Sequence, residues 1–373
     1  MKKNQLPPQH EQKITDLLCA LVDQGAARRL VAPYKSSSGY WFGGGNLVRG
    51  EDGTLFLCGR YRNFGDSRTG LAAGTRGLEL AIFESRDNGD SFTKLRSWSK
   101  EDLSSDAGKV LSIEGSALLL AQDGSCELYV SSEKDVAYPD EVKDYQKPST
   151  GLWSIDRIAA KDIDSLGAGT IQPVLDEKPE PGYLHVKDPV PYWTEDGGTV
   201  LLFCDHPFTW NSANTGYATR APGADHFAVA SWQMVGRGPA WDVAGTRITC
   251  RMPVPRVGVF KDKEPLSVFL YDGLECCRKH EENPHAVKRP RGYSCEELGG
   301  ALYGFDAAFR QLSRLSRVRP LFVSPWGTGC SRYVDVLVCE EGLWATWQQS
   351  QEDESQPLVG HFLDMDRVAR LLS

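Results

Sequence analysis

The sequence has no uninterrupted apolar stretch of the about 18 residues that a membrane-spanning helix needs. It also has no extended basic tract. Its formal net charge is −8, and the run from Lys288 to Arg291 is short and interrupted by proline. A nucleic-acid-binding domain usually has a basic face, so we expect neither a membrane nor a nucleic acid as a partner.

Spaced cysteine pairs of the CxxC type are missing, although the chain has 10 cysteines. Several of these cysteines lie inside apolar runs, and the first residues lack the apolar core of a secretory leader. We therefore expect reduced thiols in a cytoplasmic protein, with no metal site and no cofactor. Nothing in the sequence bears on the oligomeric state.

Helical periodicity is almost absent and occurs only near residues 10–27 and 364–372. We expect residues 1–35 to form a helix and a lead-in strand. Residues 36–373 read as one catalytic domain made of strands.

Five segments of the chain share one pattern, an apolar or alternating run that ends in polar residues. They are Thr54–Arg62, Cys126–Lys134, Thr199–Pro207, Pro265–Gly273 and Gly342–Ser350, and their first residues are 72, 73, 66 and 77 positions apart. A turn rich in Asp, Glu, Lys or Gly and a further apolar run precede each segment, which is typical of a β-hairpin. Additional strands follow each hairpin.

Such repeats predict an all-β fold, a five-bladed β-propeller of four-stranded antiparallel blades with short terminal helices. The blades are expected near residues 40–100, 108–165, 184–235, 247–310 and 325–368. The stretch Ser85–Phe92 fits the S-x-D-x-G-x-x-[W/F] pattern of the Asp-box turn found in sialidase-like propellers. In such a turn Asp87 has a structural role, because it accepts backbone N–H bonds.

A ring of polar residues is expected at the propeller axis, because the start of each first strand and the end of each second strand share one face. The predicted first-strand residues are Asn46, Glu114, Asp188, Arg256, Arg332 and Tyr333. The predicted second-strand residues are Arg60, Arg62, Glu133, Asp205, His206 and Asp272. Asp66, Arg68 and Trp210 lie in loops that follow second strands. A polar position repeated in every blade favours a binding site.

Two carboxylates on either side of a sugar can divide acid and base roles in glycosidic bond cleavage. A buried lone glutamate is costly unless it is paired or functional, so Glu114 is a predicted site residue. A neutral glutamate with a raised pKa would protonate the leaving oxygen, which makes Glu114 the predicted general acid. Asp188 is the predicted base, nucleophile or pKa modulator, and Asp66 and Asp272 are further catalytic candidates. The remaining ring residues and Trp210 are predicted to bind the oligosaccharide substrate. Structural alternatives stay open, such as a turn-forming Asp188 or a salt bridge between blades at Arg332.

The stretch Ser112–Ser116 resembles the strand that carries the general acid in the five-bladed arabinanases and β-xylosidases of glycoside hydrolase family 43. Lys187-Asp188-Pro189 resembles their Asp-Pro strand. The five-blade plan is also similar to that of families 117 and 130. The resemblance implies an acid role for Glu114 and a pKa-setting role for Asp188. The sequence departs from this pattern at Asn46, where those families have an aspartate that Asp66 or Asp272 would replace.

Four functions fit these observations. The first is a glycoside hydrolase that acts on an oligosaccharide. The second is a glycoside phosphorylase, which the arginines after the first hairpin favour. The third is a sialidase-like enzyme for an acidic sugar, for which the sequence assigns no tyrosine nucleophile. The fourth is a non-catalytic carbohydrate- or protein-binding propeller, since one fold hosts many functions.

Overall fold

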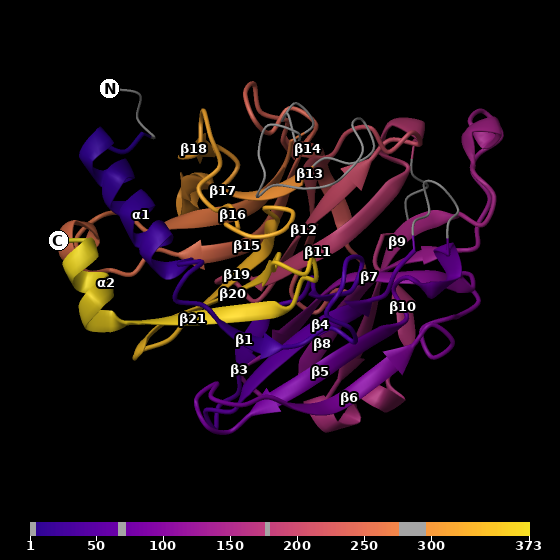
Figure 1. The fold of residues 1–373 in the computed structure, drawn as a ribbon, viewed down its shortest axis with the longest axis horizontal. Coiled ribbons are helices and arrows are strands. Elements are labelled where there is room, and N and C mark those ends of the chain that lie inside the picture. Colours follow the sequence, from indigo (N-terminus) through magenta and orange to yellow (C-terminus); the bar gives the residue numbers. More distant parts are fainter. Residues whose placement is uncertain (1–4, 66–71, 176–179, 276–295) are drawn as a thin grey trace.

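The computed structural model describes residues 5–65, 72–175, 180–275 and 296–373. The described strands form five antiparallel sheets arranged around a common centre (Figure 1). The predicted five-bladed propeller is therefore confirmed.

Each blade is a meander in which one inner strand faces the centre. Blade 1 contains β2 (Trp41–Gly43), β3 (Leu47–Arg49), β4 (Leu55–Arg62), β5 (Glu79–Ser85) and β6 (Thr93–Ser99). Blade 2 contains β7 (Val110–Leu120), β8 (Cys126–Lys134), β9 (Leu152–Ala160) and β10 (Ile171–Pro173). Blade 3 contains β11 (His185–Trp193), β12 (Thr199–His206), β13 (Asn214–Arg220) and β14 (Ala228–Val235).

Blades 4 and 5 complete the ring. Blade 4 contains β15 (Gly245–Pro253), β16 (Leu266–Glu275), β17 (Glu296–Phe305) and β18 (Ser313–Arg314). Blade 5 contains β19 (Ser331–Val338), β20 (Gly342–Gln349) and β21 (Leu358–Asp364), with β1 (Arg28–Val31) as its outer strand. Because β1 pairs antiparallel with β21, a segment from the start of the sequence completes the last blade.

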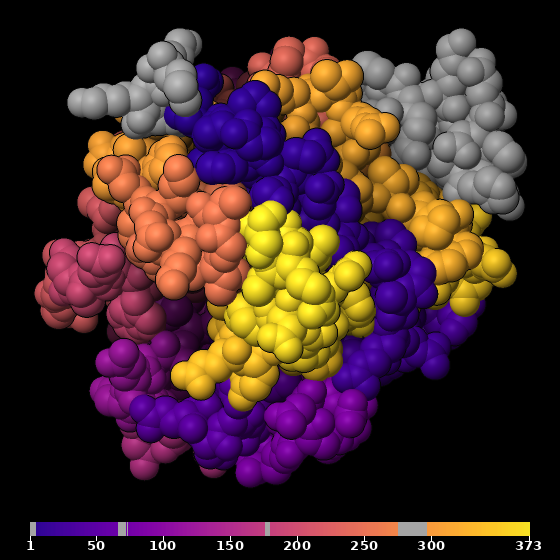
Figure 2. All heavy atoms as spheres, turned by 90° about the vertical axis from the view of Figure 1, so that its left-hand side faces the viewer, coloured from indigo at the N-terminus to yellow at the C-terminus, as the bar shows by residue number. Residues whose placement is uncertain are grey.

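Two helices pack on the same side of the molecule. They are α1 (Pro8–Leu21) and α2 (Met365–Leu371), which confirm the two helical regions expected from the sequence. Figure 2 shows them close together, α1 in indigo and α2 in yellow. The apolar face of α1, formed by Ile14, Leu17, Leu18 and Leu21, is buried against blades 4 and 5. We expect this burial to stabilise the helix more than its intrinsic propensity does.

Burial falls from the centre to the rim of a blade. Every residue of β12 is buried, whereas β14 at the rim of the same blade is largely exposed or half-buried. A strand covered on both faces shows a continuous apolar run, and a rim strand shows a mixed pattern. The second strands were therefore the easiest elements to recognise in the sequence.

The inner strand of blade 4 differs from its prediction. The sequence pattern placed it immediately before the turn at Lys261, so that Arg256 opened it. In the structure the inner strand is β15, and residues 258–260 form a short 3-10 helix in the connection to β16. Arg256 is exposed and donates to the carbonyl of Lys261 in that connection. The prediction that Arg256 lies in the axial ring is therefore wrong.

Bonds from side chains to the backbone tie neighbouring blades together around the centre. The donor–acceptor pairs are Asn46 Nδ2–Leu118 O (2.9 Å), Asp188 N–Ser131 Oγ (3.2 Å), Ile248 N–Thr215 Oγ1 (3.0 Å), Thr249 Oγ1–Val334 O (2.7 Å) and Leu47 N–Asp335 Oδ2 (2.8 Å). Each of the five blade junctions has one such bond. Buried polar groups that are fully paired in this way define one packing arrangement.

Asp335 allows a test of this ring, because burial raises the pKa of its carboxyl group to about 6. A carboxyl group whose pKa is higher in the folded state than in the unfolded state stabilises the fold only below its folded pKa. Its stabilising contribution is therefore lost as the pH rises from about 4 to about 6. Asp335→Asn keeps an acceptor for Leu47 but does not ionise.

We expect the stability of Asp335→Asn relative to the wild type to rise by about 2 kcal/mol between pH 4 and pH 7.5. Urea unfolding at both pH values measures this difference. Asp196→Asn, at an exposed turn, is the control. If the difference in stability between Asp335→Asn and the wild type stays constant across this pH range, the pKa of Asp335 is not raised in the folded protein.

Candidate functional site

Two backbone irregularities mark the axial ends of the inner strands. Asp188 in β11 has a φ of 56°, and Tyr333 in β19 has a φ of 51°. Residues other than glycine rarely adopt this left-handed conformation. Where they do, the backbone is strained, and such strained residues cluster at functional sites. The two residues touch, because the Tyr333 hydroxyl donates to Asp188 Oδ1 at 3.2 Å.

Glu114, near the start of β7, lies between two arginines from β4. Arg60 Nη2 is 3.3 Å from Glu114 Oε2, and Arg62 Nη1 is 3.0 Å from Oε1. Ser112 Oγ donates to Oε1 at 3.0 Å. Burial alone would raise the pKa of Glu114, but the two guanidinium groups outweigh it and hold this pKa at about 2. Glu114 is therefore a carboxylate at neutral pH.

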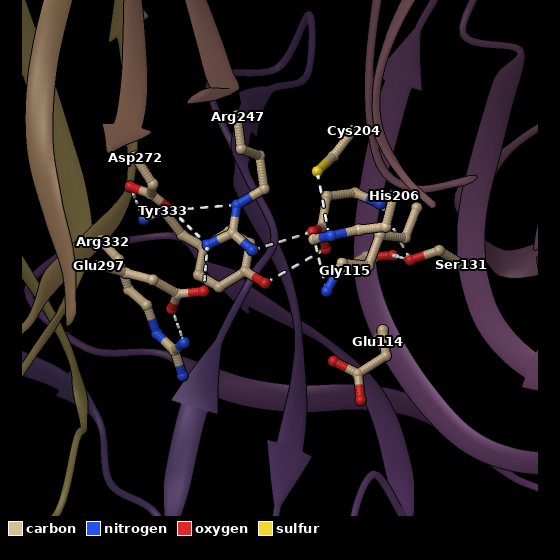
Figure 3. Close-up of polar contacts among 12 residues, drawn as sticks. Glu114, Gly115, Ser131, Cys204, His206, Arg247, Asp272, Glu297, Arg332 and Tyr333 are labelled. Carbon is tan, nitrogen blue, oxygen red and sulfur yellow. Dashed lines mark hydrogen bonds and ion pairs between the residues drawn. The ribbon is translucent and has the colours of Figure 1, made fainter. Parts of the chain in front are cut away.

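Arg247, on the axial end of β15, joins two of the predicted carboxylates. Its Nη1 is 3.1 Å from Asp188 Oδ2, and its Nη2 is 2.5 Å from Asp272 Oδ2. The backbone N–H of Tyr333 donates to Asp272 Oδ1 at 3.0 Å. In Figure 3, Arg247 and Tyr333 lie in the middle of the group, with Asp272 to the left and Gly115 and Glu114 to the right. Blades 3, 4 and 5 thus meet in one buried network.

Arg332 forms the third part of the cluster. It makes an ion pair with Glu297 on β17, and its guanidinium carbon lies 4.2 Å from the ring centroid of Trp41 on β2. Glu297 also lies 3.2 Å from Arg247 Nη2. Arg332 therefore connects blades 4, 5 and 1, which agrees with the salt-bridge alternative left open for it and leaves its role in substrate binding a prediction.

The motif residue Gly115 explains how Asp188 and Glu114 come together. A β-carbon at Gly115 would lie 2.2 Å from Asp188 Oδ1, which no real contact allows. Ser131 Oγ links the same two residues, because it donates to Gly115 O at 2.7 Å and accepts from Asp188 N. A side chain at this position would push the two inner strands apart. Gly115 thus brings the axial ends of blades 2 and 3 into contact.

Glu133, Asp205, His206 and Trp210 lie around this centre but not in its ion-pair network. Glu133 contacts Arg76 and accepts from Gly151 N at 2.8 Å. Burial raises the pKa of Asp205 to about 7, and its Oδ1 accepts from Asn214 Nδ2 at 3.4 Å. His206 Nδ1 donates to Ser212 O at 2.8 Å, so its imidazole holds the backbone of the loop between β12 and β13.

Trp210 belongs to a cluster of aromatic residues beside His206. The Trp210 ring stacks on His185 with centroids 3.8 Å apart, and its Nε1 donates to Tyr138 Oη at 3.3 Å. Trp210 is thus already packed, and its predicted stacking on a sugar stays a prediction.

The remaining predicted residues are placed differently or cannot be placed. Asn46 lies between β2 and β3, and its amide bonds both the N–H and the C=O of Leu118. It directly precedes β3, so it opens the second part of an inner strand whose first part is β2. Asp66 and Arg68 lie outside the described residues.

Sequence reasoning missed several charged residues of the site, among them Arg76, Arg247 and Glu297. Arg247 was missed because the connection after β15 is long and hid the inner strand. Glu297 lies near the start of a third strand, whereas the prediction considered only first and second strands. Arg76 lies in the loop between β4 and β5. Its neighbour Gly77, which has a φ of 51°, was the one available signal of a constrained backbone.

The part of the chain that the structure describes also bears on metal ligation and membrane insertion. Within it, no group of three or more His, Cys, Asp or Glu side chains is placed to hold a metal ion. No helix there is long and apolar enough to cross a membrane. The expectation that the protein needs no cofactor stays a prediction.

Comparison with known proteins adds structural relatives only. No protein-family model matches the chain, and no curated protein sequence matches it significantly. A solved structure described as a glycoside hydrolase is 13% identical, with a TM-score of 0.63 and 96% of each chain covered.

Two further solved structures are similar over most of their length. A β-1,2-mannobiose phosphorylase from Listeria innocua is 10% identical, with a TM-score of 0.53 over 92% of this chain and 96% of its own. An α-L-arabinanase from Penicillium chrysogenum, complexed with arabinobiose, is 9% identical, with a TM-score of 0.52 over 91% and 98%. At these identities the comparisons show a shared five-bladed propeller fold.

Proposed function

We propose that this protein cleaves glycosidic bonds by hydrolysis, at the axial site formed by Glu114 and Asp188. The observation that carries the proposal is the ionised Glu114 carboxylate, held between Arg60 and Arg62 beside Asp188 at the ends of adjacent inner strands. Most glycosidases use two carboxylates at one site to cleave the bond. The fold similarity to glycoside hydrolases supports this class.

The charge state of Glu114 bears on its role. A general acid must hold a proton at the working pH, and the two arginines favour the ionised form. We therefore assign Glu114 the role of base or nucleophile, in place of the acid role suggested by family resemblance. Asp188 is the second carboxylate, and Arg247 and the Tyr333 hydroxyl fix its position.

Phosphorolysis is a second candidate, and the cations near Glu114 favour it. Arg62 and Lys187 have side chains 14% and 15% exposed, so they lie at the accessible edge of the site. A phosphate placed between them could replace water as the attacking group, because both side chains are good phosphate ligands. The structural similarity to a mannobiose phosphorylase agrees with this candidate.

A panel of p-nitrophenyl furanosides and pyranosides, supplemented with natural oligosaccharides, tests both functions. Hydrolysis predicts release of free sugar that does not depend on phosphate. Phosphorolysis predicts a sugar 1-phosphate as product, formed only with phosphate. If the wild type turns over no glycoside in either buffer, the proposed function is wrong and a binding role takes its place.

A further inference from the structure

The charges of the axial site are unevenly distributed. Among the described residues it has seven cations, Arg60, Arg62, Arg76, Arg247, Arg332, Lys100 and Lys187, and five carboxylates, Glu114, Glu133, Asp188, Asp272 and Glu297. Asp188, Asp272 and Glu297 surround Arg247 and Arg332. The other five cations lie near Glu114 and Glu133, and Lys187 also lies 4.0 Å from Asp188 Oδ2. We call Arg62, Arg76, Lys100 and Lys187 the basic side of the site.

Arg76, on the basic side, has buried hydrogen-bond donors that are not all paired. Its side chain is 1% exposed, and one terminal nitrogen contacts Glu133. Its Nε and its Nη1 have no hydrogen-bond partner among the residues that the structure describes. Buried donors are almost always paired, because an unpaired one has given up its hydrogen bonds to water without a replacement. A ligand with oxygen acceptors would supply the missing partners.

Lys187 and Lys100 add to the positive charge near Arg76. The Trp153 ring lies between Arg76 and Lys187, with its centroid 5.8 Å from Arg76 Cζ and 5.4 Å from Lys187 Nζ. Burial lowers the pKa of Lys100 to about 8, and repulsion from the nearby Arg76 adds to this effect. An incoming negative group would relieve that repulsion.

We propose, on the basis of the proposed function, that the basic side binds an anionic oxygen group carried into the site with the substrate. The carboxylate of an acidic sugar is one source of this group, and a phosphate is the other. Guanidinium groups bind both in the same two-pronged geometry. The substrate class is therefore an acidic glycoside, or a neutral glycoside cleaved with phosphate.

Calorimetric titration with small probes tests this inference without turnover. The probes are galacturonate and glucuronate, their neutral counterparts galactose and glucose, and inorganic phosphate. We expect one anionic probe to bind at least about tenfold more tightly than the neutral sugars, which matches one charge-assisted hydrogen bond. Preference for a uronate identifies an acidic substrate, and preference for phosphate identifies phosphorolysis.

Arg76→Gln should abolish the preference, and Lys187→Met, at a more accessible position, should reduce it if Arg76→Gln fails to fold. Arg220→Gln is the matched control, since that guanidinium is also buried but is fully paired with Glu127 at 2.8 and 2.9 Å. Glu114→Gln should still bind the anion, even though it loses turnover. Anion binding no tighter than neutral sugar binding, or a preference unchanged in both Arg76→Gln and Lys187→Met, overturns the inference. Failure of turnover alone would count only against the proposed function.

Discussion

Glu114→Gln should lower kcat/KM on aryl glycosides by about a thousandfold or more, while the protein stays folded. The substitution preserves the shape of the side chain and removes the negative charge that Arg60 and Arg62 hold in place. A p-nitrophenolate leaving group needs no proton from the enzyme. A loss on this substrate therefore measures the base or nucleophile role rather than the acid role.

Leaving groups and an external nucleophile separate the two roles of Glu114. If Glu114 is the base or nucleophile, alkyl and aryl glycosides should lose activity alike, and azide should restore part of the aryl turnover. If Glu114 is instead the acid, aryl turnover should survive while alkyl turnover is lost. Glu127→Gln is the control, because Glu127 is also paired with two arginines but lies away from the axis. Full activity of Glu114→Gln on both substrates would remove this residue from the mechanism.

Arg247→Met should lower the free energy of unfolding by about 3–5 kcal/mol, the cost of leaving buried charges without their partner. Arg247 is 2% exposed and neutralises Asp188 and Asp272, which have no other cation within 3.5 Å among the described residues. Its guanidinium carbon also lies 4.2 Å from the Tyr333 ring centroid. Methionine fills a similar volume and supplies none of these interactions.

The matched control lies on the same strand. Arg251 pairs with Asp306 at 3.1 Å, but both side chains are partly exposed. Arg251→Met should therefore cost less than about 1 kcal/mol, as exposed ion pairs usually do. Urea midpoints of the two variants measure the contrast. Equal destabilisation by the two substitutions would mean that the axial network does not stabilise the propeller, and that its residues serve binding alone.

The blade plan could be predicted because most hairpins of this chain close with a short turn. The turns near Gly53, Gly124 and Gly197 each follow an apolar run and precede a fully recognisable second strand, so the alternation reads directly. Blade 4 breaks this rule with a connection that spans residues 254–265. The sequence pattern placed the inner strand directly before the hairpin turn, which is too late in the chain. Arg256 was therefore predicted to lie at the axis, where the structure has Arg247.

The composition of the site was only partly predictable for a similar reason. Glu114, Asp188 and Tyr333 stand at strand openings, where topology alone brings them to the axis. Arg76 comes from a loop and Glu297 from a third strand, so no strand-based rule could place them there. The charge state of Glu114 depends on which arginines face it across a blade junction, and that pairing is a three-dimensional property.

The pairing of β1 with β21 has a consequence for how the protein is made. Residues 28–31 leave the ribosome long before residues 358–360, which are their partners. The ring therefore stays open through most of synthesis, and the edge of β21 is unprotected whenever β1 is slow to dock. An uncovered strand edge pairs readily with another chain. Substitutions that weaken the pairing of β1 with β21 should first appear as poor yield and aggregation during expression, before any change in the properties of the folded protein.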